Sequence, residues 1–178
     1  MRAYLVLGSL LVFGCGDHDH PPTADIDKSP QPLVALEDWV QSAREQDPFV
    51  NPDSPPPECE QSGVRAEDAQ GFLELDTNEC NFITVIAGAR YDVAEGEELQ
   101  LEVSHFDLEA AAPAKANLRL WFEECAVWEK SIAIPSAAKV YSERFASPCP
   151  ISQGGQVLLH VSNHGQNTYQ FRSLTVLR

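Results

Sequence analysis

Residues 99–103 read LQLEV, and this stretch decides the fold class. Every second residue is apolar and those between are polar, as expected for a strand that buries one face and exposes the other. The same alternation returns in NLRLWFE, residues 117–123, where the apolar positions are again spaced by two. The pattern therefore predicts strands rather than helices.

Outward from these stretches, residues 72–177 contain short apolar alternations separated by Gly, Pro and Asn, with no long helical pattern. Such a chain is typical of an all-β domain, and about eight strands suit a two-sheet, jelly-roll-like sandwich. The predicted strands are Phe72–Asp76, Phe82–Ala87, Leu99–Leu108, Asn117–Glu123, Val127–Ile134, Val140–Ala146, Gln156–Asn163 and Thr168–Leu177. In the last strand the apolar face changes phase, which predicts a β-bulge near Arg172 and Ser173.

The amino-terminal residues 1–15, MRAYLVLGSLLVFGC, have the order of a secretory signal peptide. One positive charge, Arg2, precedes an apolar run that is too short to span a bilayer permanently. The last four residues, VFGC, resemble the lipobox of bacterial lipoproteins. This resemblance implies that Cys15 is acylated, by diacylglyceryl and palmitate groups, and becomes the mature amino terminus. Residue 16, directly after Cys15, is glycine and not the aspartate that retains some lipoproteins at the inner membrane. The protein is therefore expected at the outer membrane, facing the periplasm or the outside.

Residues 16–57 are acidic and contain nine of the thirteen prolines. This composition predicts a semi-extended tether, followed by the sandwich domain at residues 58–178. Residues 32–45, PLVALEDWVQSARE, interrupt the tether with apolar residues at helical spacing, which predicts a short amphipathic helix. Two interpretations of this helix remain open: its Trp39 docks on the domain, or the segment folds on contact with a partner.

Acidic residues outnumber basic ones by 27 to 12, giving a net charge of -15. This charge repels phosphate backbones and argues against nucleic-acid binding. The expected partners are the membrane, through the lipid, and a glycan or another envelope protein.

With Cys15 assigned to lipid, an even set of cysteines remains in an exported, oxidising setting. We expect two disulfides, Cys59 with Cys80 and Cys125 with Cys149, because each closes a loop of roughly 20 to 25 residues. No spacing typical of zinc ligands accompanies them.

The closing segment HVSNHGQNTYQFRSLTV, residues 160–176, resembles the last strands of galactose-binding and other carbohydrate-binding jelly-roll modules. A wider set of segments, from LDTNECNFITV onward, is similar to uncharacterised exported bacterial lipoproteins, from which no activity transfers. Sugar recognition needs an aromatic plane and planar polar side chains. The candidate ligand-binding residues are Trp121, Asn163, His164, Asn167 and Tyr169.

Two tryptophans differ in their expected environment. Trp121 falls between apolar neighbours on its strand, so it is expected on the outer face, whereas Trp128 shares a face with Ile132 and Ile134 and is expected in the core.

His105 and Asp107, with the distant His160, resemble the facial triad of non-haem iron oxygenases. The face that carries His105 and Asp107 is apolar, which favours a structural role for them. No catalytic residue and no cofactor are predicted, because motifs for nucleophilic catalysis or phosphate binding are missing. The sequence favours a non-catalytic binding module for glycan or protein; a structural envelope component and a metal-dependent jelly-roll enzyme remain as alternatives.

Overall fold

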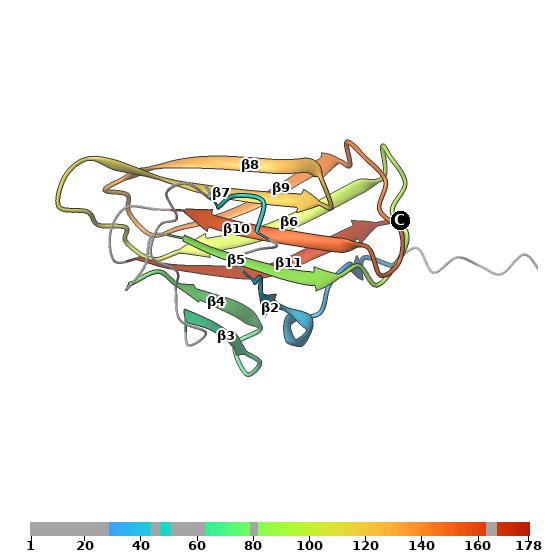
Figure 1. Ribbon diagram of the computed structural model, residues 1–178, viewed down its shortest axis with the longest axis horizontal. Coiled ribbons are helices and arrows are strands. Elements are labelled where there is room, and N and C mark those ends of the chain that lie inside the picture. The colour runs from blue at the N-terminus through green and yellow to red at the C-terminus, as the bar shows by residue number, and fades with distance from the viewer. Residues whose placement is uncertain (1–28, 44–46, 51–62, 79–81, 163–166) are drawn as a thin grey trace, which may run out of the picture.

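Alternating apolar residues form strands that pair into two antiparallel sheets, and these sheets pack face to face (Figure 1). The computed structural model describes residues 29–43, 47–50, 63–78, 82–162 and 167–178. Sheet A has the order β3 (Val64–Glu67), β4 (Phe72–Asp76), β11 (Thr168–Leu177), β6 (Glu98–His105) and β9 (Lys139–Ala146), with β1 (Gln31–Pro32) also on β11. Sheet B has the order β2 (Val40–Gln41), β5 (Phe82–Gly88), β10 (Gln156–Ser162), β7 (Ala114–Phe122) and β8 (Cys125–Ile134).

The order of pairing is that of a jelly roll. The innermost pair along the chain is β7 with β8. Around it lie three further pairs, which alternate between the two sheets: β6 with β9, β5 with β10, and β4 with β11. The predicted all-β, two-sheet sandwich is confirmed. Among the eight predicted strands, Phe72–Asp76 and Thr168–Leu177 have the observed bounds.

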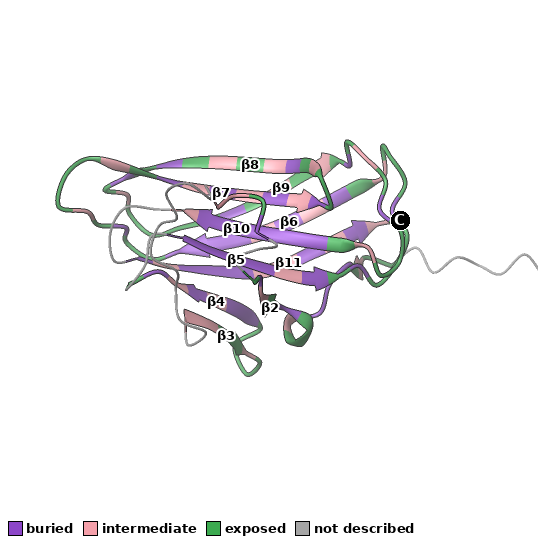
Figure 2. Ribbon diagram, viewed as in Figure 1, coloured by how far each residue is buried: buried purple, intermediate pink, exposed green. Residues whose placement is uncertain are grey.

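Residues 99–103 and 117–123, whose alternation predicts strands, turn the apolar side chains of this pattern to the inside of the sandwich. Leu99, Leu101 and Val103 of β6 have at most 2% of their surface exposed. The apolar positions of β7 are buried to the same extent, and over most of both strands buried residues alternate with residues of intermediate burial (Figure 2). The predicted bulge is also present, because the register of β11 against β6 shifts between Phe171 and Ser173.

The amphipathic helix predicted for residues 32–45 is wrong. The segment contains one 3-10 turn, η1 (Leu36–Asp38), between the short strands β1 and β2. Its backbone completes both sheets: the Leu33 amide donates to the Leu174 carbonyl at 2.8 Å, and the Ser42 amide donates to the Thr84 carbonyl at 2.9 Å. Backbone groups that form these hydrogen bonds cannot also form the hydrogen bonds of a helix, so the segment is extended.

The sandwich therefore includes residues that the sequence assigns to the tether. Trp39 docks on the domain, as one interpretation of the segment proposed, and its ring meets that of Phe171 edge-on at 5.2 Å. The predicted domain boundary at residue 58 lies outside the described residues.

The disulfide predicted between Cys125 and Cys149 is confirmed, and it links the start of β8 in sheet B to the segment that follows β9 in sheet A. Cys15, Cys59 and Cys80 lie outside the described residues. Within the described ranges, no helix combines the length and the hydropathy that a membrane span requires.

Candidate functional site

The outer face of sheet B carries aromatic and polar side chains in adjacent rows. On β7, Leu118 and Leu120 belong to the core, so the residues between them point to the other side of the sheet. Strand pairing then places the polar residues of the neighbouring strands beside them. We define the outer face of sheet B as Phe82, Thr84, Asn117, Arg119, Trp121, Glu129, Ser131, Leu158 and His160.

Two polar pairs lie across β7 and β8 on this face. The Nε atom of Arg119 is 3.4 Å from a carboxylate oxygen of Glu129. The hydroxyl of Ser131 donates to the side-chain oxygen of Asn117 at 2.5 Å. These four residues, together with Leu118 and Lys130, line a hollow of about 250 Å³, which we call the polar hollow. It presents an amide, a guanidinium and a carboxylate, which are planar groups suited to pairing with hydroxyls.

His160 lies at the centre of this face and is 3% exposed. Its Nδ1 atom shares a hydrogen bond of 2.7 Å with the hydroxyl of Thr84. Burial, and secondarily the positive charge of Arg119, lower the pKa of His160 to about 3. The imidazole is therefore neutral at physiological pH.

Acid should destabilise the protein through His160. The unfolded chain binds a proton at this histidine below its ordinary pKa near 6.5, whereas the folded chain does not until about pH 3. The free energy of unfolding is then expected to fall by about 2 kcal/mol between pH 6.5 and pH 5, at about 1.4 kcal/mol per pH unit. Urea unfolding at both pH values measures this loss. A His160→Gln variant should show a shallower pH dependence, and an identical slope in the two proteins would contradict the prediction.

Trp121 is next to His160 on the outer face, and the ring of Phe49 lies over both residues. The Phe49 ring meets Trp121 edge-on at a centroid distance of 5.0 Å, and it is 4.3 Å from the imidazole of His160. The indole N–H of Trp121 is buried and has no hydrogen-bond partner among the described residues. The face therefore holds an aromatic plane with an unused donor.

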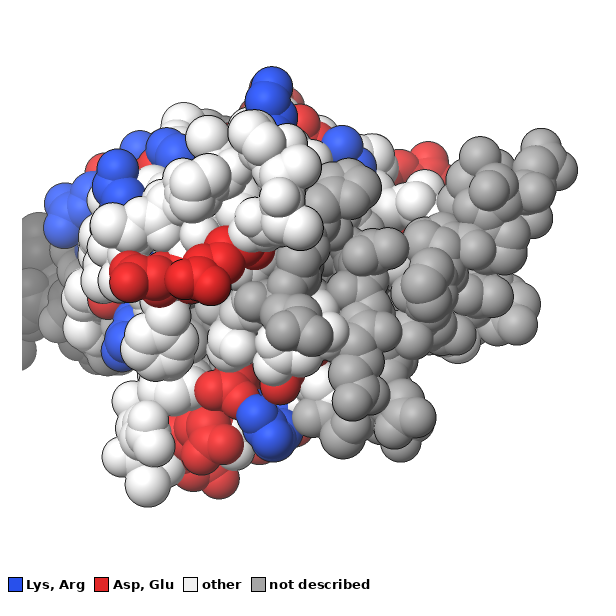
Figure 3. Space-filling view, turned by 90° about the vertical axis from the view of Figure 1, so that its left-hand side faces the viewer, with Lys and Arg blue, Asp and Glu red and all other residues white. Residues whose placement is uncertain are grey.

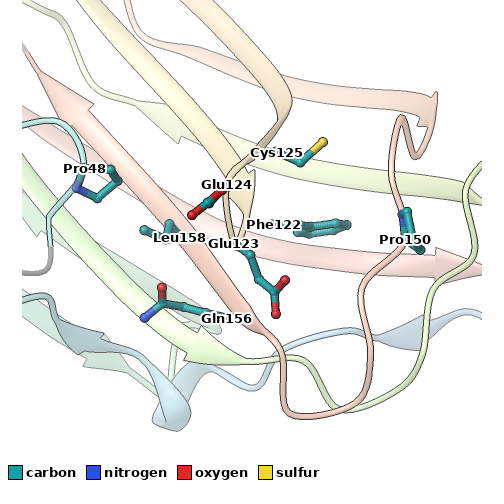
Figure 4. A pocket seen from close by; sticks show the side chains of 8 residues that line it. All are labelled: Pro48, Phe122, Glu123, Glu124, Cys125, Pro150, Gln156 and Leu158. Carbon is teal, nitrogen blue, oxygen red and sulfur yellow. The ribbon is translucent and has the colours of Figure 1, made fainter.

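A second hollow, of about 710 Å³, lies toward the other end of β7. Figure 4 shows its lining, with Leu158 and Gln156 on β10 and the turn residues Glu123 and Glu124 between β7 and β8. Pro48, the residue before Phe49, also lines it. We call it the turn hollow. The outer face of sheet B thus has one hollow on each side of the Trp121 and Phe49 contact.

A third hollow, of about 920 Å³, lies near the loop between β6 and β7. Its lining is dominated by residues 110–114, four alanines and one proline, with Ala133 and Ile134 of β8. Among the described residues in the view of Figure 3, most of the surface is uncharged apart from an acidic band and separate charged clusters. This hollow has no aromatic plane, so it suits sugar recognition less well than the outer face of sheet B does.

The structure places two of the predicted ligand-binding residues away from this face. Tyr169 is 1% exposed within the core, where burial raises its pKa. Asn167 is 3% exposed, and its side chain bonds to the backbone amide and carbonyl of Glu109. Both are placed as structural residues. Asn163 and His164 lie outside the described residues.

Trp121 is brought into the candidate site, and three further residues were missed by the sequence analysis. Asn117 and Arg119 alternate with the same leucines that placed Trp121 on the outer face, so the signal for them was available. Phe49 had no comparable signal, because its position depends on how a distant segment crosses the sheet. Trp128 packs against the core, as predicted, and its indole donates to the carboxylate of Glu143 at 2.7 Å.

The three residues that resemble a facial metal triad do not converge. His105 is buried in sheet A, with its Nδ1 atom 2.6 Å from the Phe106 carbonyl, whereas His160 is on the outer face of sheet B. The carboxylate of Asp107 accepts a hydrogen bond from the Ala138 amide at 2.7 Å. Within the described part of the chain, no group of three or more His, Cys, Asp or Glu residues is arranged to hold a metal ion.

No family model matches this sequence, and no curated protein matches it. Solved structures similar to the chain include a carbohydrate-binding module CBM4 (14% identity, 79% of this chain and 95% of that chain, TM-score 0.45). A xylan-binding module CBM15 matches at 12% identity over 84% and 95% of the two chains, with TM-score 0.44. The N-terminal cellulose-binding domain of a Cellulomonas fimi β-1,4-glucanase matches at 13% over 83% and 91%, with TM-score 0.42. At these values the similarity assigns no ligand to this chain, and its function is inferred from the outer face of sheet B.

Proposed function

We propose that this protein is a non-catalytic glycan-binding module whose ligand lies on the outer face of sheet B. One observation carries the proposal: Trp121, on this outer face, is flanked by the polar hollow and the turn hollow. An indole plane packs against the apolar C–H face of a pyranose. A sugar ring on Trp121 would place its hydroxyls over one or both hollows.

The polar side chains beside Trp121 have the chemistry that sugar hydroxyls need. Asn117 and Arg119 offer donors, and Glu129 offers acceptors, in fixed planar geometries. The unpartnered indole N–H of Trp121 adds a donor that a hydroxyl oxygen would satisfy. Buried donors without partners are costly, so pairing this group is a gain that a ligand supplies.

The charges around the polar hollow favour a neutral glycan. Arg119 is paired with Glu129, and Lys130 is paired with Glu143 at 2.7 Å, so neither cation is left to attract an anion. The net charge of -15 also repels polyanions. Neutral polysaccharides are therefore the expected ligands, and sulfated or uronic-acid-rich ones are not.

Replacing Trp121 with alanine is expected to weaken binding to a neutral glycan about thirtyfold, because the ring supplies the stacking surface, worth about 2 kcal/mol as a binding hot spot. A glycan array identifies the ligand, and isothermal titration calorimetry measures the dissociation constant. Trp128→Phe is the matched control, since that tryptophan faces the core and should leave affinity unchanged. Equal affinities for wild type and Trp121→Ala would contradict the proposed face.

A structural envelope component is the second candidate, and the packing of Phe49 on Trp121 favours it. In that case the face is filled by the chain's own residues and needs no ligand. An array that stays empty for both the wild type and a protein with Phe49 removed would support this second function.

We further propose that the module is anchored to the outer membrane through lipid on Cys15. The lipobox-like residues 12–15 support the lipid anchor, and Gly16 favours the outer membrane. The acidic, proline-rich residues that follow suit a spacer between lipid and domain.

A further inference from the structure

Phe49 covers the part of the outer face of sheet B that the ligand would use. Besides its ring contacts with Trp121 and His160, Phe49 lies under the guanidinium of Arg119, whose central carbon is 5.3 Å from the ring centroid. All three of these partners are on β7 or β10. The phenyl ring thus occupies the centre of the face.

The burial of neighbouring side chains agrees with such a cover. Leu158, His160 and Thr84 are on the outer face, yet each is at most 3% exposed. Leu158 is paired directly with Trp121 across β7 and β10. Side chains on the outer surface of a single sheet reach this burial only when further chain lies over them.

Among the described residues, Asp47–Val50 contacts this face through the ring of Phe49 and has no strand pairing to it. Among the described residues, the amides of Phe49 and Val50 donate back to Asp47, at 2.9 Å to its carboxylate and 3.3 Å to its carbonyl. Asp47–Val50 forms no backbone pairing with β5, β10 or β7. Aromatic and cation–π contacts of this kind are individually weak, so displacing the Phe49 ring breaks no strand pairing of the described residues.

Phe49 is adjacent to residues of both hollows. Arg119, which contacts the Phe49 ring, lines the polar hollow, and Pro48, the residue before Phe49, borders the turn hollow. The contact of Phe49 with Trp121 therefore lies between residues of the two hollows.

We infer that Asp47–Val50 is an intramolecular competitor of the ligand, with Phe49 occupying on Trp121 the position that a sugar ring takes when the segment moves away. This inference rests on the proposed function of the face. It adds that the resting protein is partly inhibited and that ligand affinity includes the free energy of displacing Phe49.

The first measurement tests the cover without any ligand. Hydrogen exchange of the Trp121 indole N–H, followed by NMR in the full mature protein, should accelerate at least tenfold in Phe49→Ala. Phe106→Ala is the matched control, because Phe106 is 58% exposed outside this face and its removal should not change the exchange rate. Thermal unfolding of each variant checks that the fold is retained. Unchanged exchange in Phe49→Ala would overturn the cover.

The second measurement tests competition. The affinity of Phe49→Ala for the neutral glycan found on the array should be about tenfold higher than that of wild type, and Phe49→Ala combined with Trp121→Ala should lose binding. Faster indole exchange with equal glycan affinities would overturn the competition while the proposed function stands. Faster exchange with no glycan bound by any variant would instead overturn the proposed function, and with it the competitor role of Phe49.

Discussion

Replacing Trp39 with alanine is expected to lower the free energy of unfolding by about 4 kcal/mol, the largest effect of a single substitution considered for this protein. Trp39 is 5% exposed, and its indole packs edge-on against Phe171 of β11. Truncation leaves a cavity at the point where the amino-terminal segment joins the core, and the surrounding strands are too constrained to fill it. Urea unfolding followed by circular dichroism measures the loss.

Two variants make this test specific. Val40→Ala changes the next residue, which is 57% exposed, and should alter stability by less than about 0.5 kcal/mol. Trp39→Phe keeps an aromatic ring and removes an indole N–H that has no partner among the described residues, so it should cost much less than alanine. A loss below about 1 kcal/mol for Trp39→Ala would show that the segment behaves as a tether after all.

Removing the disulfide by changing Cys125 and Cys149 to alanine together is expected to cost about 3 kcal/mol. The bond closes a loop with a sequence separation of 24, and opening it returns that much chain entropy to the unfolded state. The loop contains β8 and β9, which are edge strands of different sheets, so its opening also frees the two edges from each other.

The control for this prediction uses reduction. In a background where Cys59 and Cys80 are alanine, a reductant should lower the stability of the protein to that of the variant lacking all four cysteines. A peptide map of unreduced protein that shows free thiols at Cys125 and Cys149 would contradict the prediction directly.

The strands of the sandwich were predictable because alternation is a local property. A strand in LQLEV buries one face whichever strand becomes its neighbour, so the pattern appears in the sequence itself. The bulge in β11 was predictable for the same reason, since a phase change in the apolar face requires an extra residue. The Cys125–Cys149 disulfide was predictable because an even number of cysteines remained after Cys15 and because this pair closes a short loop.

The candidate site was predictable only in part. Trp121 was placed correctly on the outer face, because the neighbouring residues of its own strand fix that face. Tyr169 has a polar hydroxyl that suits a sugar, but it is paired with Leu75 of β4 and His105 of β6 on the buried side of sheet A. Residue type alone did not distinguish the ring in the core from the ring on the outer face of sheet B.

By itself, the sequence determined the eight longer strands from β4 to β11 and which face of each is apolar, because these depend on the period of neighbouring side chains; β1, β2 and β3 were not predicted. Only the tertiary structure decided the conformation of residues 32–43 and the position of Phe49 on Trp121. Their partners are backbone groups and rings from strands far away in the chain, such as Thr84, Leu174 and His160. The segment is extended despite its helical spacing, because the strand edges of β5 and β11 pair with its backbone. A local sequence pattern contains no information about such distant hydrogen-bond partners.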